Sequence, residues 1–213
     1  MKPEDVVRYS REQWSEPRAE ALDAEIAGYP FSVREAQVLD LAAGPGAYTA
    51  ALLRAGAGLV VWHDVDAGFL ESAKRALPSS PRVRFEVRDM LDLPYPAGSF
   101  DMVALRDALH WASDEARLLR HLAALIRPGG WLVLTNHNFR RPLATVRPRW
   151  RAAAHLASPP LAALLGRKPV PTLWVLEGLT RRRLRCAGFE VVEWRRPRPA
   201  DFEAICRRSP GPG

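Results

Sequence analysis

The segment from Val38 to Ala57, VLDLAAGPGAYTAALLRAGA, constrains the fold of this chain more than any other. An apolar run that ends on Asp40 is typical of a buried strand, and the small-residue turn after it leads directly into a helical pattern. Gly44 and Gly46 leave the backbone of the turn bare and can adopt positive φ. A strand, turn and helix of this kind predict an open α/β sheet whose first turn binds a ligand.

Strand-like and helix-like segments alternate along the chain. The expected strands are 37–42, 59–65, 82–89, 100–107 and 131–138, and the expected helices are 47–56, 68–77 and 114–126. Ser113 is the expected N-cap of the last of these helices, and PGG at 128–130 predicts a turn. This alternation predicts βαβ units and a mostly parallel sheet with helices on both faces.

The end of the chain predicts a different strand arrangement. A helix is expected at 178–189, followed by strands at 189–196 and 201–209. Only PRPA separates these two strands, which is too short for a crossover helix, so they must be antiparallel. The expected fold is therefore α/β and Rossmann-like, with an antiparallel last strand.

We expect the 213 residues to form one domain with four parts. Residues 1–36 predict an N-terminal helical cover, with Ser10 as an expected helix N-cap. Residues 37–138 form the expected ligand-binding core. The proline-rich segment 139–177 predicts broken helices that cover the active site, and 178–209 supply the final helix and strand pair.

Basic residues are distributed unevenly. The formal net charge is +7, yet segment 116–176 contains no Asp or Glu and ten basic residues. Such a segment suits an anionic small molecule or RNA. Arginine outnumbers lysine 28 to 3, which is also what a GC-rich genome produces. All three explanations stay open, and the arginines concerned are Arg140, Arg141, Arg147, Arg149 and Arg151.

Other features argue against secretion, membranes and disulfides. The start, MKPEDVVRYS, lacks the apolar region of a signal peptide, and no apolar run approaches the ~18 residues of a membrane span. Cys186 and Cys206 form neither a metal cluster nor a disulfide framework. We therefore expect a cytoplasmic protein that has no membrane partner.

The turn after Asp40 limits the ligand it can bind. No Lys-Ser/Thr follows the glycines, which excludes a P-loop, and a dinucleotide fingerprint needs a third glycine where Thr49 stands. A carboxylate before the turn suits a ligand with an ammonium group or hydroxyls. S-adenosylmethionine (SAM) has an ammonium, a sulfonium, a ribose diol and an adenine amine, so it fits this pattern.

Further carboxylates follow the second and third strands. Asp64 lies 20 residues after Gly44, a position that suits ribose hydroxyls of SAM or equally of NAD. Asp66 is a near alternative, and either residue could be a helix cap. Asp89 could accept a hydrogen bond from the adenine amine or be a solvated turn residue, with Met90 packed on the adenine.

Taken together, these motifs resemble those of the class I SAM-dependent methyltransferases, most closely the small type 11 branch. VLDLAAGPG is similar to the family's glycine motif, HDVDAGFLESAKRAL to its second motif, RDMLDLPYPAGSFDMVALRDALHW to its third and fourth, and LLRHLAALIRPGGWLVLTN to its fifth. Ala42 stands where the family has its first glycine. The resemblance implies seven strands with an antiparallel last strand, in agreement with the pattern above.

The resemblance also implies which residues hold the cofactor SAM. The implied contacts are Asp40, Ala42, Gly44 and Gly46 at the methionine, Asp64 and Val65 at the ribose, Asp89 and Met90 at the adenine, and Arg106 beside the methionine and the acceptor.

Methyl transfer to a nucleophile is an in-line displacement at an activated carbon, so alignment and water exclusion supply most of the rate. A base is needed only if the nucleophile is protonated. His137, after the fifth strand, is the candidate base, and its alternative is a loop or lid histidine. His110 is expected to be structural. Asp107 and Asn136 are too few ligands to predict a metal.

The acceptor class narrows by exclusion. LRDA stands where amino-methyltransferases of adenine or glutamine carry Asn/Asp-Pro-Pro-Tyr/Phe, and neither cysteine lies near the fourth or fifth strand, as cytosine-C5 chemistry requires. The expected function is methyl transfer to an O or N atom of a small-molecule acceptor, with transfer to a carbon atom left open. An RNA methyltransferase and a non-catalytic SAM-binding partner protein stay as alternatives.

Overall fold

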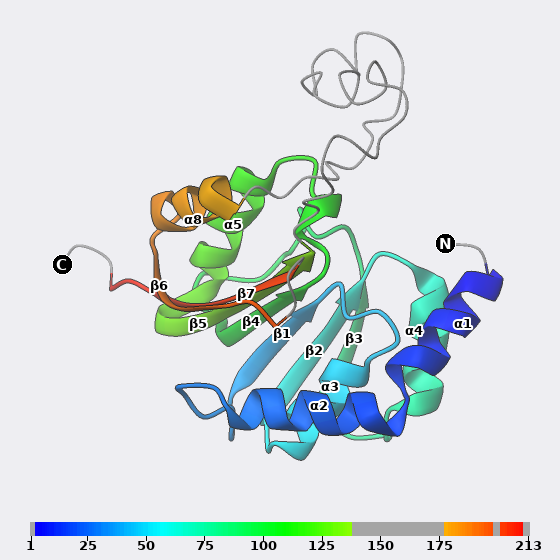
Figure 1. Cartoon of the computed structure of the whole chain (residues 1–213). Helices are drawn as coiled ribbons and strands as arrows, with labels where there is room; N and C mark the ends of the chain where they lie inside the picture. Colours follow the sequence, from blue (N-terminus) through cyan, green and yellow to red (C-terminus); the bar gives the residue numbers. More distant parts are fainter. Residues whose placement is uncertain (1–2, 138–176, 198–200, 211–213) are drawn as a thin grey trace, which may run out of the picture.

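The computed structural model describes residues 3–137, 177–197 and 201–210, and within them one sheet of seven strands in the order β3-β2-β1-β4-β5-β7-β6 (Figure 1). The strands are β1 Gln37–Leu41, β2 Leu59–Asp64, β3 Val83–Val87, β4 Phe100–Arg106, β5 Ile126–His137, β6 Phe189–Arg195 and β7 Asp201–Arg208. Strand β7 runs antiparallel to both neighbours, whereas the pairs from β3 to β5 are parallel. The expected fold class is thereby confirmed.

Helices cover both faces of the sheet (Figure 1). They are α1 Pro3–Gln13, α2 Glu16–Ala27, α3 Ala47–Arg54, α4 Ala67–Ala76, α5 Glu115–Leu125 and α8 Glu177–Cys186, with a short 3₁₀ helix at Leu109–Trp111. Helices α5 and α8 pack on one face, and α1 to α4 lie on the other. The longest of these helices has 12 residues, and none of the helices described here has the length and apolar character to cross a bilayer.

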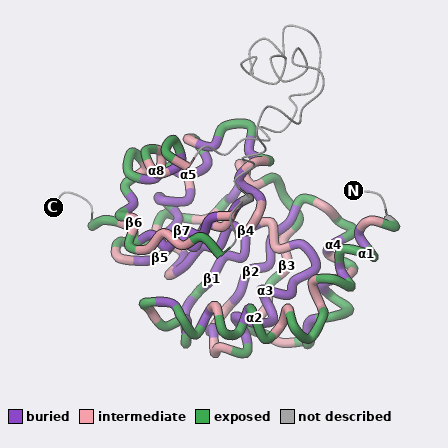
Figure 2. Tube along the Cα trace, viewed as in Figure 1, coloured by how far each residue is buried: buried purple, intermediate pink, exposed green. Residues whose placement is uncertain are grey.

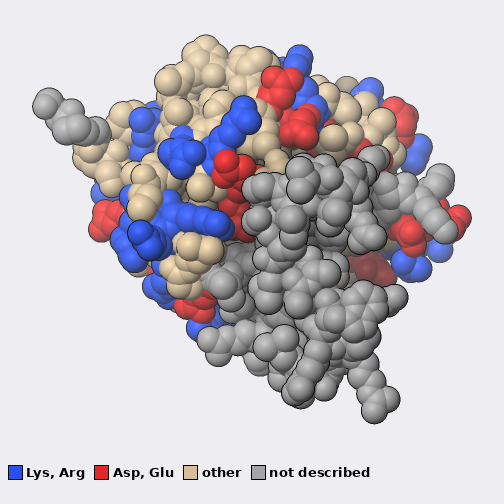
Figure 3. Space-filling view, turned by 90° about the horizontal axis from the view of Figure 1, so that it is seen from above, with Lys and Arg blue, Asp and Glu red and all other residues tan. Residues whose placement is uncertain are grey.

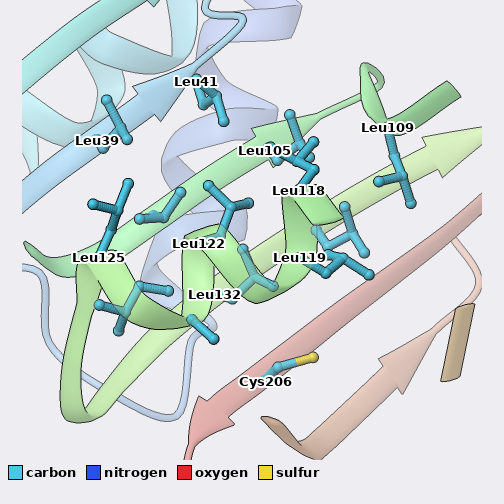
Figure 4. Packing of buried hydrophobic residues seen from close by; sticks show 14 of the residues in the cluster. Leu39, Leu41, Leu105, Leu109, Leu118, Leu119, Leu122, Leu125, Leu132 and Cys206 are labelled. Atoms are coloured by element: carbon cyan, nitrogen blue, oxygen red, sulfur yellow. The ribbon is translucent and has the colours of Figure 1, made fainter. Parts of the chain in front are cut away.

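The central strands are apolar because both of their faces are covered (Figure 2). Alternate residues of β1 enter opposite cores, so that Val38 packs with the α3 side and Leu39 with the α5 side. Figure 4 shows the second of these cores, in which Leu39 and Leu105 lie near the leucines of α5, including Leu122.

Three local expectations are wrong. Helix α1 begins at Pro3, so Ser10 lies inside it and pairs with Ser72 through their hydroxyls at 3.0 Å. Asp114, not Ser113, caps α5, because its carboxylate accepts the N–H of Arg117 at 2.9 Å. The PGG turn expected at 128–130 is instead part of β5, where the register with β4 shifts. The proposed lid at 139–177 lies, except for its last residue, outside the described residues.

An ion pair fastens α2 to the sheet at the carboxyl end of β4. The guanidinium of Arg106 forms two hydrogen bonds with the carboxylate of Glu25, of which the Nη2–Oε2 bond measures 3.0 Å. The hydroxyl of Tyr29 donates to Glu25 Oε1 at 2.7 Å, and the Arg106 guanidinium lies 4.3 Å from the ring centre of Tyr48. The Arg106 and Glu25 side chains are only 12% and 20% exposed, so the pair is largely shielded from water.

We expect Glu25→Ala to lower the free energy of unfolding by about 3 kcal/mol, because it leaves the charge of Arg106 buried without its partner. Urea unfolding measures the loss. Asp23→Ala is the matched control on the same helix: its pair with Arg54 is 47% and 46% exposed, and its removal should cost at most about 1 kcal/mol. Equal losses in the two variants would contradict the assigned role of Glu25.

Candidate active site

A cavity of about 1250 Å³ lies at the carboxyl ends of the parallel strands, where the strand order reverses between β1 and β4. Its floor comes from the loops after β1, β2, β3 and β4 and from the first residues of β7. Its roof comes from the cover helices: Tyr9 and Gln13 of α1, and Arg18, Ala21 and Glu25 of α2. Ligands of open α/β sheets bind at such a point of reversal.

The loop between β1 and α3 shows why the two glycines of the sequence motif differ. Gly44 has φ +54° and lines the cavity; a Cβ atom there would lie 3.7 Å from the ring of Tyr9. Gly46 has φ +88° and does not line the cavity, and its Cβ would lie 3.0 Å from Cδ1 of Leu77, the residue that follows α4. Gly46 therefore allows the loop to bend and α3 to approach α4, while Gly44 borders the ligand space.

Ala42 adopts φ +57°, the left-handed region that favours glycine. The strain arises because the bend of the loop requires a positive φ at this position, where the Cβ atom of Ala42 is crowded by the backbone. Ala42 lines the cavity, as expected for a residue beside the ligand.

Ala42→Gly should raise the free energy of unfolding by about 0.5–1 kcal/mol, because relief of the left-handed strain outweighs the greater entropy of the unfolded glycine chain. The matched variant Ala43→Gly should lower it by about the same amount, since Ala43 carries no positive φ to relieve. Thermal unfolding of both variants checks the opposite signs; stability lost in both would refute the strain at Ala42.

Asp40 is buried beneath the loop. Its carboxylate accepts the hydroxyl of Thr49 at 2.6 Å, and burial raises the pKa of Asp40 to about 6. Asp40 does not line the cavity. The structure therefore does not place its carboxylate where it would contact the methionine of SAM directly, as the resemblance implies.

Asp64 reaches the cavity and also shapes the loop. Its two oxygens accept the N–H groups of Gly44 at 2.8 Å and of Asp66 at 3.0 Å, and burial raises its pKa. Asp66 caps α4 through the N–H of Gly68 at 2.9 Å and also lines the cavity, so its assignment as the ribose contact stays an alternative. Val65, between them, is exposed and lines the cavity.

The loop after β3 forms the end of the cavity beside Asp64. Asp89, Met90 and Leu91 all line it. One oxygen of Asp89 accepts the N–H of Leu91 at 2.8 Å, so this carboxylate holds the turn and borders the cavity at once. Its geometry is thus compatible with both expectations, a turn residue and a contact of the adenine amine.

A row of polar side chains forms the opposite end. Arg106 of β4 pairs in register with Thr135 of β5, which pairs with Glu203 of β7, and paired residues point to the same face of a sheet. All three line the cavity. Burial and the nearby charge of Glu25 raise the pKa of Glu203 to about 7, although Arg195 lies 3.7 Å from its Oε2 atom.

The two candidate histidines differ in position. His137 is the last residue of β5 and pairs in register with Asp201, and its side chain lies outside what the structure describes, so its role as a base stays a prediction. His110 Nδ1 lies 3.1 Å from Asn136 Oδ1 and does not line the cavity. Within the described ranges, no three His, Cys, Asp or Glu residues are grouped to hold a metal ion.

The sequence reasoning did not name the cavity residues of α2 or of β7. Arg18, Ala21 and Glu25 follow one another at helical spacing, so they share one face of α2. That spacing was a usable signal for a face turned toward the site. Nothing local marks Glu203, because only the pairing of β7 with β5 brings it there.

Comparison with known proteins identifies the family. A family model described as a methyltransferase domain matches residues 39–134. The chain is 31% identical to a demethylmenaquinone methyltransferase of Clavibacter sepedonicus over 167 residues, which cover 75% of this chain and 67% of that protein. The chain belongs to the SAM-dependent methyltransferases.

This methyltransferase is also similar to a further relative in sequence and to a solved structure in fold. A trans-aconitate 2-methyltransferase of Deinococcus radiodurans is 38% identical over 124 residues, or 56% of this chain and 45% of that protein. A Haloferax volcanii protein solved in complex with the Trm112 methyltransferase activator shares the fold, with a TM-score of 0.71, 17% identity, and coverage of 99% of this chain and 98% of that one.

The cofactor of the methyltransferase is therefore SAM, and the cavity fits it chemically. Carboxylates at Asp64 and Asp89 suit ribose hydroxyls and an adenine amine, and the apolar Val65, Met90 and Leu91 suit the faces of the base. The cavity also extends to Thr135 of β5 and Glu203 of β7.

Stability of the methyltransferase should depend on pH through Glu203. Its raised pKa means that the folded state retains a proton that the unfolded state releases above about pH 4.5. The resulting stabilisation is complete below about pH 4.5 and is lost as the pH rises to about 7. Glu203→Gln should therefore gain stability relative to wild type across this window, by at most about 1.4 kcal/mol per pH unit.

Urea unfolding at pH 5, 6, 7 and 8 measures the difference between Glu203→Gln and wild type, and Glu190→Gln, at an exposed position of β6, is the control. A difference that does not change with pH for Glu203→Gln would contradict the raised pKa.

Proposed function

We propose that this methyltransferase transfers the methyl group of SAM to an oxygen or nitrogen atom of a small-molecule acceptor. The observation that carries the proposal is the polar end of the cavity, which Thr135 and Glu203 line together with Arg18 and Glu25 of the cover helix α2. A cavity with a roof and a polar wall suits a small molecule that fits inside it, rather than one part of a macromolecule. The names of two relatives, demethylmenaquinone methyltransferase and trans-aconitate 2-methyltransferase, also refer to small acceptors.

In the proposed arrangement each end of the cavity has its own task. Asp64 accepts hydrogen bonds from the ribose hydroxyls, Asp89 accepts from the adenine amine, and Met90 packs on the base. SAM supplies an activated methyl group on its sulfonium. The walls near Arg106 and Thr135 hold the acceptor in line with that methyl group and exclude water, which supplies most of the rate.

A proton acceptor is needed only if the attacking atom carries a proton. Two residues at the acceptor end fit this role in our proposal. His137 ends β5 on this edge of the sheet, and Glu203 has a pKa near the working pH, which suits a general base.

An RNA substrate has less support from the described residues. Of the ten basic residues in the acid-free segment 116–176, the structure describes only Arg117, Arg120 and Arg127. Arg127 forms an ion pair with Asp101 at 2.6 Å. Figure 3 shows acidic and basic side chains interspersed over the face in view outside the grey residues. The five arginines from Arg140 to Arg151 lie outside the described residues, so their binding of an anionic acceptor stays a prediction.

Asp64→Asn should weaken binding of S-adenosylhomocysteine by about 1–3 kcal/mol, because a charge-assisted hydrogen bond to the ribose is lost. Isothermal titration calorimetry measures the affinity. Asp66→Asn is the control and should change it little, since Asp66 caps α4. If Asp66→Asn weakens binding more than Asp64→Asn, the ribose contact belongs to Asp66.

The proposed acceptor class is tested by release of S-adenosylhomocysteine from SAM with fractionated cell extract. We expect turnover with the fraction below about 1 kDa and none with purified tRNA or rRNA. Turnover that requires RNA, together with salt-dependent filter binding, would support the RNA methyltransferase instead. Cofactor binding without turnover in any fraction would support the non-catalytic partner protein.

A further inference from the structure

One cation in the cavity roof has hydrogen-bond donors that the protein does not use. Arg18 of α2 lines the cavity, and its Nε atom is buried without a hydrogen-bond partner. Within the described part of the chain, its guanidinium forms no hydrogen bond and no ion pair. A guanidinium presents five N–H donors in a planar fork, and a buried donor such as Nε is costly to leave without a partner.

Arg106, the other cation of the cavity, is in the opposite situation. Glu25 receives two hydrogen bonds from its guanidinium, and the ring of Tyr48 lies against it. Its charge is compensated within the protein. Arg18 lacks such a partner, and both burial and the positive charge of Arg106 lower its pKa, so an anion that enters the cavity would relieve this cost.

The surroundings of Arg18 define which part of a ligand reaches it. The charged groups that act on Arg18 are Arg106 and Asp107 at the end of β4 and Glu25 of α2. In the sheet, β3 lies beside β2, and β1 and then β4 come next. Asp89 lies in the loop after β3, and Asp64 ends β2. A cofactor with its adenine near Asp89 and its ribose near Asp64 therefore extends its amino-acid part toward β4 and Arg18.

We propose that Arg18 binds the carboxylate of the amino-acid part of SAM. A carboxylate and a guanidinium match as a planar, two-bonded pair, which no other described cation of the cavity is free to form. The residues expected at this end from the sequence do not fill the role, since Asp40 is buried under Thr49 and has the wrong charge, and Arg106 is engaged by Glu25.

The test compares two ligands that differ only in the proposed partner of Arg18. SAM has the carboxylate, and decarboxylated SAM lacks it but keeps the adenosine, the sulfonium and the ammonium. By calorimetry, Arg18→Gln should weaken SAM about 10- to 100-fold and decarboxylated SAM less than about 2-fold. Wild type should prefer SAM over decarboxylated SAM by a similar factor, and Arg18→Lys should restore part of the affinity for SAM.

Arg8→Gln is the matched control, because Arg8 is an exposed residue of the neighbouring helix α1 that pairs with Asp5 at 2.8 Å. It should change neither affinity, and thermal unfolding verifies that all variants fold. The proposal is overturned if wild type binds both ligands equally, if Arg18→Gln leaves SAM binding unchanged, or if it weakens both ligands to the same extent. No acceptor is present in this experiment, so its result is independent of the proposed acceptor class.

Discussion

The ion pair between Glu25 and Arg106 is the interaction on which the architecture of the site depends. It joins α2, whose Leu22 and Ile26 pack in the core, to the end of β4, and so helps to hold the roof of the cavity over its floor. Two further contacts hold the cover helices: Trp14 Nε1 donates to the carbonyl of Pro45 at 3.0 Å, and Arg195 donates to the carbonyl of Gly28 at 2.9 Å.

Charge compensation explains how so many ionised groups fit in one cavity. Arg106 lowers the pKa of Glu25 although burial acts in the other direction, and Glu25 in turn helps to raise the pKa of Glu203. The proton that Glu203 retains reduces repulsion between the two carboxylates. Arg18 is the member of this group that has no partner within the described protein, and this is why it points to the cofactor.

The sequence predicted the sheet well because strands buried on both faces must be apolar throughout, as Val38 and Leu39 illustrate. The short link before Asp201 predicted the antiparallel strand through a geometric limit on crossovers. Local signals predicted less at Gly46 and Asp40, since the sequence shows that a glycine can bend or that a carboxylate is present, but not whether it faces a ligand or a neighbouring helix. Contacts such as Glu25 with Arg106 join residues far apart in the chain and leave no local pattern.

A crystal structure of the protein with S-adenosylhomocysteine tests the central claim most directly, namely that the roofed cavity at the reversal of strand order holds the cofactor. The account predicts density for the adenine beside Asp89 and Met90, the ribose hydroxyls within hydrogen-bond distance of Asp64, and the amino-acid part beneath α2. Density outside this cavity, or a reversed ligand with its adenine against Glu203, would contradict it.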